Sequence, residues 1–178
     1  DGEIDIIDAN GNIHPIMDLY LKQMNGSKVV NDVCVYKEKA YLAMSWGILV
    51  VNMQKAEIED TYYIGNESSE VNVQYICTVG DKVYAMTDSG LYCANMRDNL
   101  VDYAYWYTIE KPIGNTVSGM RELSGMLFLV IDGQLWKLQK DNWVQIPLRK
   151  LRGLHKTGDN LWLLPVKPDG IGKLPKSG

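Results

Sequence analysis

The sequence predicts an all-β fold, a partial β-propeller built of four-stranded antiparallel blades. Three observations predict it: a repeated unit, strands with apolar residues at consecutive positions, and no segment with a sustained helical period. In each unit a glycine follows an apolar strand and a polar turn, and precedes another apolar strand. This glycine recurs at spacings of 45, 43, 43 and 37 residues, at Gly2, Gly47, Gly90, Gly133 and Gly170.

Each unit divides into short strands rich in β-branched and aromatic residues, which we name A to D in chain order. The opening unit supplies only strands C and D, over residues 3–7 and 12–19. The next unit is expected to place its strands at 30–36, 39–44, 48–53 and 58–64, and the following one at 71–79, 82–87, 91–95 and 103–109. A third whole unit follows at 118–123, 126–131, 134–138 and 143–147, and the last has strands only at 151–157, 160–166 and 171–174.

The blades therefore comprise about three whole ones and two partial ones in a single domain. Their expected ranges are 1–24 (strands C and D only), 25–66, 67–111, 112–148 and 149–178 (lacking strand D). Two-residue connections such as Gly80-Asp81 suit antiparallel hairpins between strands A and B. Runs such as Ile48 to Val51 make both faces of a sheet apolar, which is typical of blades stacked between two others.

Composition excludes several classes of function. With a net charge of −4 and a pI near 5.2, the chain lacks the basic face that nucleic acid or an anionic membrane requires. Its longest apolar run is far shorter than the roughly 20 residues that cross a bilayer, so we expect no membrane insertion by this segment. Cys34, Cys77 and Cys93 show neither C-x-x-C spacing nor a nearby histidine, which predicts no disulfide framework, no metal site and no cofactor.

Two stretches resemble known propellers. The stretch 160–163 (NLWL), followed by Asp169-Gly170-Ile171, resembles the repeat of two-component-regulator propellers from Bacteroidetes. Residues 30–65, VNDVCVYKEKAYLAMSWGILVVNMQKAEIEDTYYIG, are similar to the N-terminal propeller of the PorZ family, which is associated with type IX secretion. The resemblance implies a non-enzymatic protein exported to the periplasm or cell surface, of which this segment is one part. Such propellers have six to eight blades, more than this chain supplies.

No catalytic constellation stands out. His14 and His155 have no Asp or Ser partner in a recognisable motif, and no phosphate-binding or metalloprotease motif occurs. Acidic residues in the B–C turns and in the 65–70 loop should share one rim, where they would bind a cation or a basic partner, or would simply be solvated. Trp46 replaces a polar residue in its B–C turn, so it either stacks on a ligand or packs on a neighbouring blade. The candidate ligand-binding residues are Trp46, Glu67, Glu70, Asp88, Asp132 and Asp169.

These features predict a recognition or scaffold module that binds a protein or carbohydrate on its loop face. Two alternatives stay open: the sensor domain of a membrane signalling protein, and a propeller carbohydrate-active enzyme that uses the rim carboxylates. The unfinished first and last blades also predict exposed strand edges. Two chains would then complete each other's split blades as a homodimer.

Overall fold

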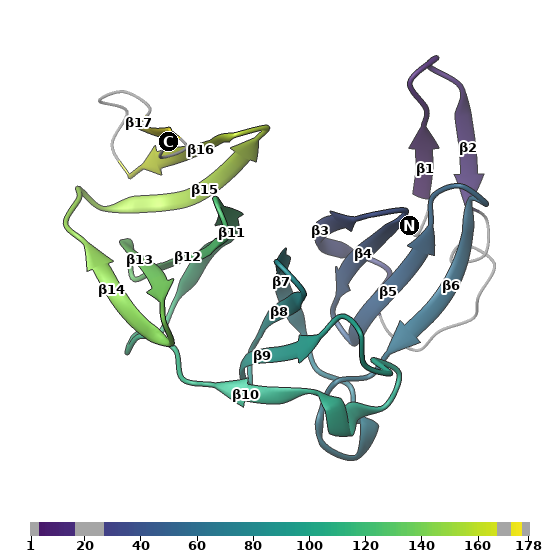
Figure 1. Cartoon of the computed structure of the whole chain (residues 1–178), viewed down its shortest axis with the longest axis horizontal. Coiled ribbons are helices and arrows are strands. Elements are labelled where there is room, and N and C mark those ends of the chain that lie inside the picture. The colour runs from purple at the N-terminus through teal and green to yellow at the C-terminus, as the bar shows by residue number, and fades with distance from the viewer. Residues whose placement is uncertain (1–3, 17–26, 167–171, 176–178) are drawn as a thin grey trace. The chain divides into compact units, whose positions relative to one another are not determined.

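The computed structural model describes residues 4–16, 27–166 and 172–175, with the side chains of 172–175 left aside. These residues form an all-β protein of antiparallel sheets, and the prediction of fold class is confirmed (Figure 1). The chain divides into two compact units, Asp1–Ile109 and Glu110–Gly178, which are described separately. We number the sheets as blades 1 to 5 in chain order.

The first unit holds a two-stranded sheet and two four-stranded sheets. Blade 1 is the hairpin β1 (Ile4–Ile7) and β2 (Ile13–Ile16). Blade 2 comprises β3 (Val30–Tyr36), β4 (Lys39–Met44), β5 (Gly47–Asn52) and β6 (Glu57–Tyr62). Blade 3 comprises β7 (Val73–Val79), β8 (Lys82–Thr87), β9 (Gly90–Asn95) and β10 (Tyr107–Ile109).

The second unit holds a four-stranded sheet and, among its described residues, a three-stranded one. Blade 4 comprises β11 (Val117–Leu123), β12 (Met126–Ile131), β13 (Gln134–Gln139) and β14 (Asn142–Ile146). Blade 5 comprises β15 (Leu151–Thr157), β16 (Asn160–Pro165) and β17 (Gly172–Pro175). In blades 2, 3 and 4 the strands lie in the sheet in chain order, A, B, C and D, and neighbouring strands are antiparallel.

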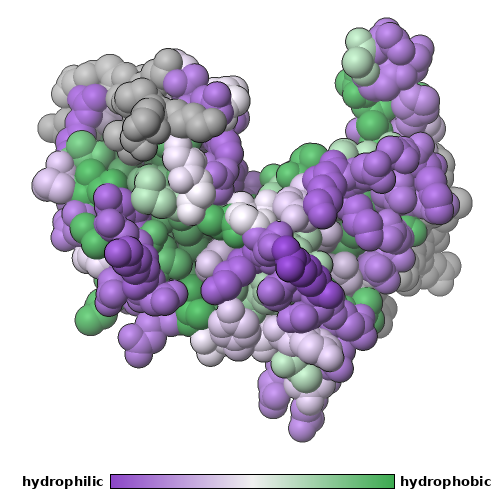
Figure 2. Space-filling model, viewed as in Figure 1, coloured by the Kyte–Doolittle hydropathy of each residue, from purple (hydrophilic) through white to green (hydrophobic). Residues whose placement is uncertain are grey.

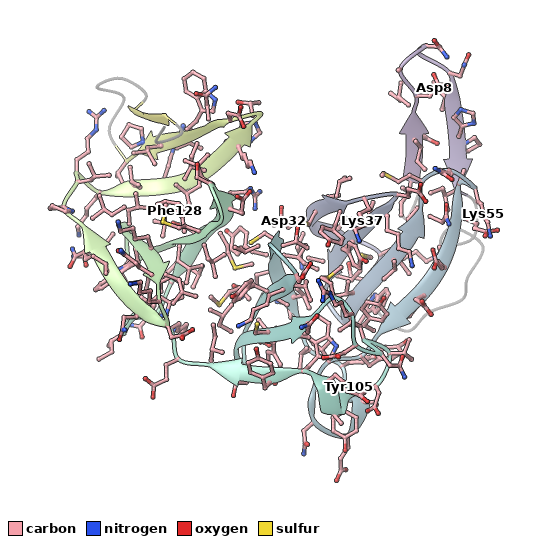
Figure 3. The ribbon with its side chains drawn as sticks, viewed as in Figure 1. Asp8, Asp32, Lys37, Lys55, Tyr105 and Phe128 are labelled. Carbon is pink, nitrogen blue, oxygen red and sulfur yellow. The ribbon has the colours of Figure 1, made fainter. Side chains whose placement is uncertain are left out.

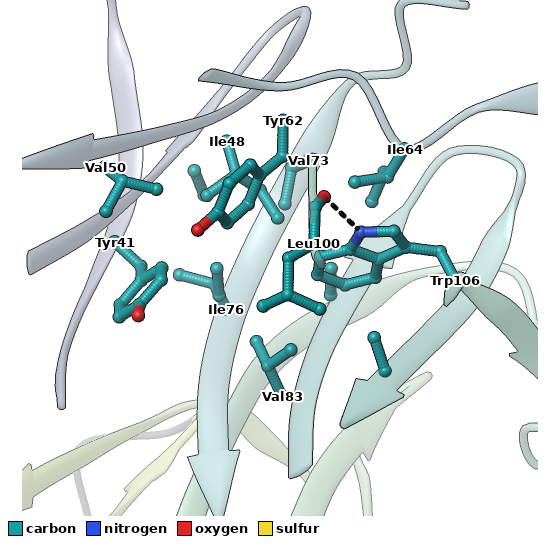
Figure 4. Close-up of a cluster of buried hydrophobic side chains, with 13 residues drawn as sticks. Tyr41, Ile48, Val50, Tyr62, Ile64, Val73, Ile76, Val83, Leu100 and Trp106 are labelled. Carbon is teal, nitrogen blue, oxygen red and sulfur yellow. Dashed lines mark hydrogen bonds between the residues drawn. The ribbon is translucent and has the colours of Figure 1, made fainter. Parts of the chain in front are cut away.

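The predicted strand D over 103–109 was wrong in its first half. Tyr103–Tyr105 form a 3₁₀ turn, η2, whose start is capped by the Asp102 carboxylate accepting a hydrogen bond from the Ala104 amide. Strand β10 contains only the last three predicted residues. The preceding loop folds inward instead: Trp106 is buried and its indole N–H donates to the Leu100 carbonyl at 3.0 Å (Figure 4).

Every strand A carries a β-bulge at its second residue. The register with strand B shifts across Asn31, Gln74, Ser118 and Arg152. A bulge leaves backbone groups without a ladder partner. In the first unit, polar side chains of β3 bond to such backbone groups on β7. The Asn31 side-chain amide donates to the Val73 carbonyl at 2.7 Å, and the Asp32 carboxylate accepts from the Ile76 backbone amide at 3.1 Å.

Apolar layers hold adjacent blades together. Between blades 2 and 3, Tyr41, Ala43 and Tyr62 meet Val83 and Ala85 in one buried cluster (Figure 4). Between blades 4 and 5, the corresponding cluster includes Phe128, Val130, Leu161 and Leu163. The stacking uses one face of strand B from the earlier blade and the opposite face of strand B from the later one. This repeated layer explains why both faces of these strands are apolar in the sequence.

Candidate functional site

A groove of about 690 Å³ lies at the end of the first unit where strands A turn into strands B. Blade 2 supplies most of its lining, and one residue, Met96, comes from the turn that follows β9 in blade 3. Because backbone ladders fix both sides, the groove sits on a rigid scaffold. Its lining residues are Tyr36, Lys37, Glu38, Lys39, Tyr41 and Met96.

A tight turn between β3 and β4 presents Lys37 at this groove (Figure 3). Tyr36 pairs with Lys39, which leaves two turn residues between them, and Lys37 has a positive φ of 55°. The equivalent turn of blade 3 has Gly80 at φ 58°, so glycine's freedom is used there and a lysine is held in the same conformation here. The Lys37 ammonium lies 5.1 Å from the centre of the Tyr36 ring, a cation–π contact.

Tyr41 links the groove to the core. Its ring is buried and lies 6.5 Å from that of Tyr62, centre to centre. Burial and the nearby Glu59 carboxylate raise the pKa of Tyr41 to about 12, so the phenol stays neutral and able to donate. The Lys39 ammonium pairs with Glu59 at 2.5 Å, and this hydrogen bond holds the pKa of the Glu59 carboxyl below its usual range.

The groove therefore combines aromatic and thioether surface with cationic and phenolic donors. Such a surface suits recognition of a partner that has both an apolar part and hydrogen-bond acceptors. Among the described residues, no group of three or more His, Cys, Asp or Glu could hold a metal ion.

Of the predicted rim residues, Glu67 and Glu70 are exposed in the connection between blades 2 and 3. Glu67 lies in the 3₁₀ turn η1 (Asn66–Ser68), which is adjacent to η2. The Asp88 amide donates to the Asn72 carbonyl at 3.3 Å. In the first unit, the B–C turn of blade 3 thus contacts the end of the connection that leads into β7.

The two remaining aspartates lie in the second unit. Asp132 accepts hydrogen bonds from the amides of Thr116 (2.9 Å) and Asn115 (3.1 Å), and these bonds hold the pKa of its carboxyl below the usual range. Both carboxylate oxygens of Asp132 therefore hold the segment that leads into β11. Asp169 lies outside the described residues, as does Gly2 of the sequence repeat.

Trp46 packs inside the protein. Its side chain is 2% exposed, its ring centre is 6.0 Å from that of Tyr63, and its indole N–H donates to the Ser27 carbonyl at 3.1 Å. Of the two interpretations of this residue, the structure fits packing. No ring face is left for stacking on a ligand.

A second hollow, of about 660 Å³, lies on blade 5. It is lined by Leu154, His155, Thr157, Trp162 and Leu164. Trp162 occupies the position in blade 5 that Tyr41 occupies in blade 2, because it pairs with His155 as Tyr41 pairs with Cys34. Blade 3 covers Tyr41, whereas Trp162 remains half-buried. We therefore interpret this hollow as a blade face that nothing in the described structure covers.

Sequence reasoning missed the groove residues. One local signal existed: the A–B turn of blade 2 reads Lys37-Glu38 where those of blades 3 and 5 read Gly80-Asp81 and Gly158-Asp159. The left-handed conformation itself marks no site, because Ser124 in the equivalent turn of blade 4 has a φ of 52° and Lys140 has a φ of 49°. The approach of Met96 to this turn follows from blade stacking and has no signature in the spacing.

Comparison with known proteins resolves the family. The family defined by the N-terminal β-propeller domain of PorZ, of the type IX secretion system, matches residues 1–107. The chain belongs to this family. The resemblance first noted over residues 30–65 is thereby confirmed. A search of curated proteins finds no sequence match to the chain.

Solved structures show the same fold. PorZ, described as an essential bacterial surface component of the type IX secretion system of Porphyromonas gingivalis, has 17% identity and a TM-score of 0.66. The match covers 99% of this chain and 28% of that one, so the chain spans little more than a quarter of that protein. The extracellular domain of a putative hybrid two-component system from B. thetaiotaomicron has 12% identity, a TM-score of 0.56, and coverage of 98% and 27%. Human WBSCR16 has 8% identity, a TM-score of 0.62, and coverage of 92% and 50%.

Proposed function

We propose that this chain is a non-catalytic recognition module of an exported type IX secretion protein, and that it binds a partner protein. The observation that carries the proposal is the groove between blades 2 and 3, where Tyr36, Met96 and Lys37 meet on a rigid scaffold. Aromatic residues and methionine are enriched at protein interfaces. The groove fits an extended segment that rests an apolar side chain on Tyr36 and directs an acceptor toward Lys37.

A binding role agrees with the chemistry of the rim. The Asp132 carboxylate is engaged with backbone amides, and the rim glutamates of the first unit are exposed. A paired-carboxylate hydrolase needs one carboxyl with a raised pKa beside a second carboxylate. The lowered pKa of Asp132 is the opposite of what a general acid requires.

Export and a role in type IX secretion rest on relatives. The chain's family is defined by PorZ, and the P. gingivalis protein is described as a bacterial surface component. We propose the same location for the protein that contains this chain. Within the described residues, no helix is long and apolar enough to cross a membrane.

Site-specific photo-crosslinking tests the proposal. A photo-reactive amino acid replaces Lys37 in the groove or, as the matched control, the exposed Lys55 in the C–D turn of the same blade (Figure 3). In cells that produce the protein, we expect a discrete protein adduct at position 37 and none at position 55. Equal adducts at both positions, or a carbohydrate adduct alone, would contradict binding of a protein in the groove.

A sensor role is the second candidate, favoured by the likeness to the extracellular domain of a two-component system. It places the chain outside the cell, before a transmembrane helix and a kinase. Sequencing the complete gene tests it. A kinase domain encoded in the same reading frame supports the sensor, whereas a second propeller in that position excludes it.

A further inference from the structure

Two hydrogen-bond donors of the groove have no acceptor among the described residues. The first is the Tyr41 hydroxyl. The Tyr41 side chain is only 4% exposed, yet its hydroxyl makes no hydrogen bond with any residue that the structure describes (Figure 4). A buried hydroxyl without a partner is costly, and most such groups in proteins are satisfied. Because the raised pKa of Tyr41 keeps its phenol protonated, this hydroxyl is available to donate to a ligand.

The second donor is the Lys37 ammonium. It contacts the face of the Tyr36 ring, and no carboxylate of the described part of the chain pairs with it. The Lys39 ammonium in the same groove differs, because Glu59 pairs with it at 2.5 Å. The groove therefore offers a ligand one unpaired cation and one neutral donor.

The charges at the groove favour a singly charged acceptor. A carboxylate has two oxygens, which can accept from an ammonium and a hydroxyl at once, and such charge-assisted hydrogen bonds are strong. A phosphate group carries about two negative charges at neutral pH. The exposed Glu38 carboxylate also lines this groove and would repel a phosphate more than a carboxylate.

The floor of the groove is apolar. Hydrophilic side chains cover most of the face of blades 2 and 3 that Figure 2 shows, whereas Tyr36 and Met96 give the groove aromatic and thioether surface. An apolar floor with polar groups around it is typical of the centre of a protein interface. A ligand that fills this groove therefore needs an apolar group close to its acceptor.

We propose that the partner bound in this groove presents a carboxylate next to an apolar side chain, in an extended segment. The carboxylate accepts hydrogen bonds from the Lys37 ammonium and the Tyr41 hydroxyl, and the apolar side chain rests on Tyr36 and Met96. This inference rests on the function proposed above and names the chemical group that the groove recognises. The carboxylate is either an acidic side chain or the end of the partner's chain, and experiment distinguishes these two sources.

Three short peptides provide the probes. Acetyl-leucyl-glutamyl amide carries a side-chain carboxylate, and acetyl-leucyl-glutaminyl amide is its uncharged isostere. Acetyl-leucyl-alanine with a free C-terminus carries a terminal carboxylate. Each peptide is titrated into the full 178-residue chain labelled with ¹⁵N, and NMR chemical shifts give both the Kd and the amides that respond.

We expect the amides of residues 36–41 and of Met96 to shift, and at least one carboxylate peptide to bind at least about fivefold more tightly than the glutaminyl peptide. The tighter of the two carboxylate peptides identifies the source. Lys37→Met and Tyr41→Phe should each weaken that peptide at least about tenfold and abolish the preference for a carboxylate. Equal affinity for the charged and uncharged peptides in the original chain would overturn the proposal.

Tyr62→Phe is the matched control for Tyr41→Phe. Tyr62 is also buried, at 6% exposure, but it does not line the groove, so loss of its hydroxyl should leave Kd unchanged. Equal losses in Tyr41→Phe and Tyr62→Phe would contradict a specific role for the Tyr41 hydroxyl. Glu38→Gln should bind the carboxylate peptide at least as tightly as the original chain, because it removes a like charge. Weaker binding by Glu38→Gln would assign the groove to a basic group and overturn the carboxylate.

The peptide titrations and the crosslinking at position 37 fail independently. A protein adduct at position 37 without any preference for a carboxylate would overturn this inference and leave the recognition module standing. A carboxylate preference without a protein adduct would support the chemistry of the groove and contradict the protein partner.

Discussion

Replacing Trp46 by alanine tests whether this residue, a candidate ligand-binding residue in the sequence, packs inside the protein. Its side chain is 2% exposed and contacts the layer that holds the β1–β2 hairpin on blade 2. Removing a buried tryptophan usually costs about 3–5 kcal/mol, through lost transfer energy and the cavity left behind. For a chain of this size, that lowers Tm by on the order of 10 °C.

Trp46→Phe is the informative companion. It keeps most of the ring but removes the indole N–H that donates to the Ser27 carbonyl. Because Ser27 is exposed and water can replace that donor, we expect a loss of only about 1–2 kcal/mol. Circular dichroism on heating and in urea measures both variants, and hydrogen exchange should show β1 and β2 opening first in the alanine variant.

The reasoning would be refuted by a stability change in Trp46→Ala below about 0.5 kcal/mol, the range of ordinary surface substitutions. That result would indicate that the ring is exposed in solution, where it could stack on a ligand.

Three further variants or conditions follow from the same structure. Gly47→Ala should lower the free energy of unfolding, measured by urea titration, by at least about 2 kcal/mol more than Gly90→Ala does. A Cβ at Gly47 would lie 2.4 Å from the Tyr62 carbonyl oxygen, whereas a Cβ at Gly90 would meet nothing within 4 Å. Lys37→Gly should raise the free energy of unfolding by about 0.5–1 kcal/mol, since it relieves a left-handed lysine, while it weakens partner binding; a destabilised variant would contradict this. Asp8 has a carboxyl pKa lowered from 3.8 to about 2 by hydrogen bonds in its turn, so its contribution to stability is complete above pH 3.8 and is lost as the pH falls toward 2. Carboxyl chemical shifts followed by NMR check this, and a midpoint near 3.8 would refute it.

Most of the fold could be predicted because each blade repeats the same local chemistry. Strands such as Val30–Tyr36 and Met126–Ile131 combine β-branched and aromatic residues with turns that allow few alternatives. The residues from Tyr103 were wrongly predicted as strand because they are rich in aromatic residues, as strands are. Tertiary packing decided otherwise, since Trp106 gains more by filling the space beside Tyr62 than by extending β10.

The proposed binding groove was harder to predict. The predicted rim depended on recurring turn residues, and recurrence reflects shared structure as readily as function. Asp132 illustrates this, because its carboxylate stabilises the turn that made it recur. The groove instead arises where Tyr36 of one blade meets Met96 of the next, and a contact over so long a separation in sequence depends on stacking.

The most direct test of groove binding is calorimetric titration with the partner captured by the Lys37 crosslinker. Tyr36→Ala removes the aromatic floor of the groove, and Tyr105→Ala removes an exposed tyrosine of η2, beside the rim predicted from sequence (Figure 3). We predict that Tyr36→Ala raises Kd at least about tenfold, the effect of losing an aromatic hot spot, and that Tyr105→Ala leaves Kd unchanged. The reverse pattern would contradict the account and place the binding surface on the rim.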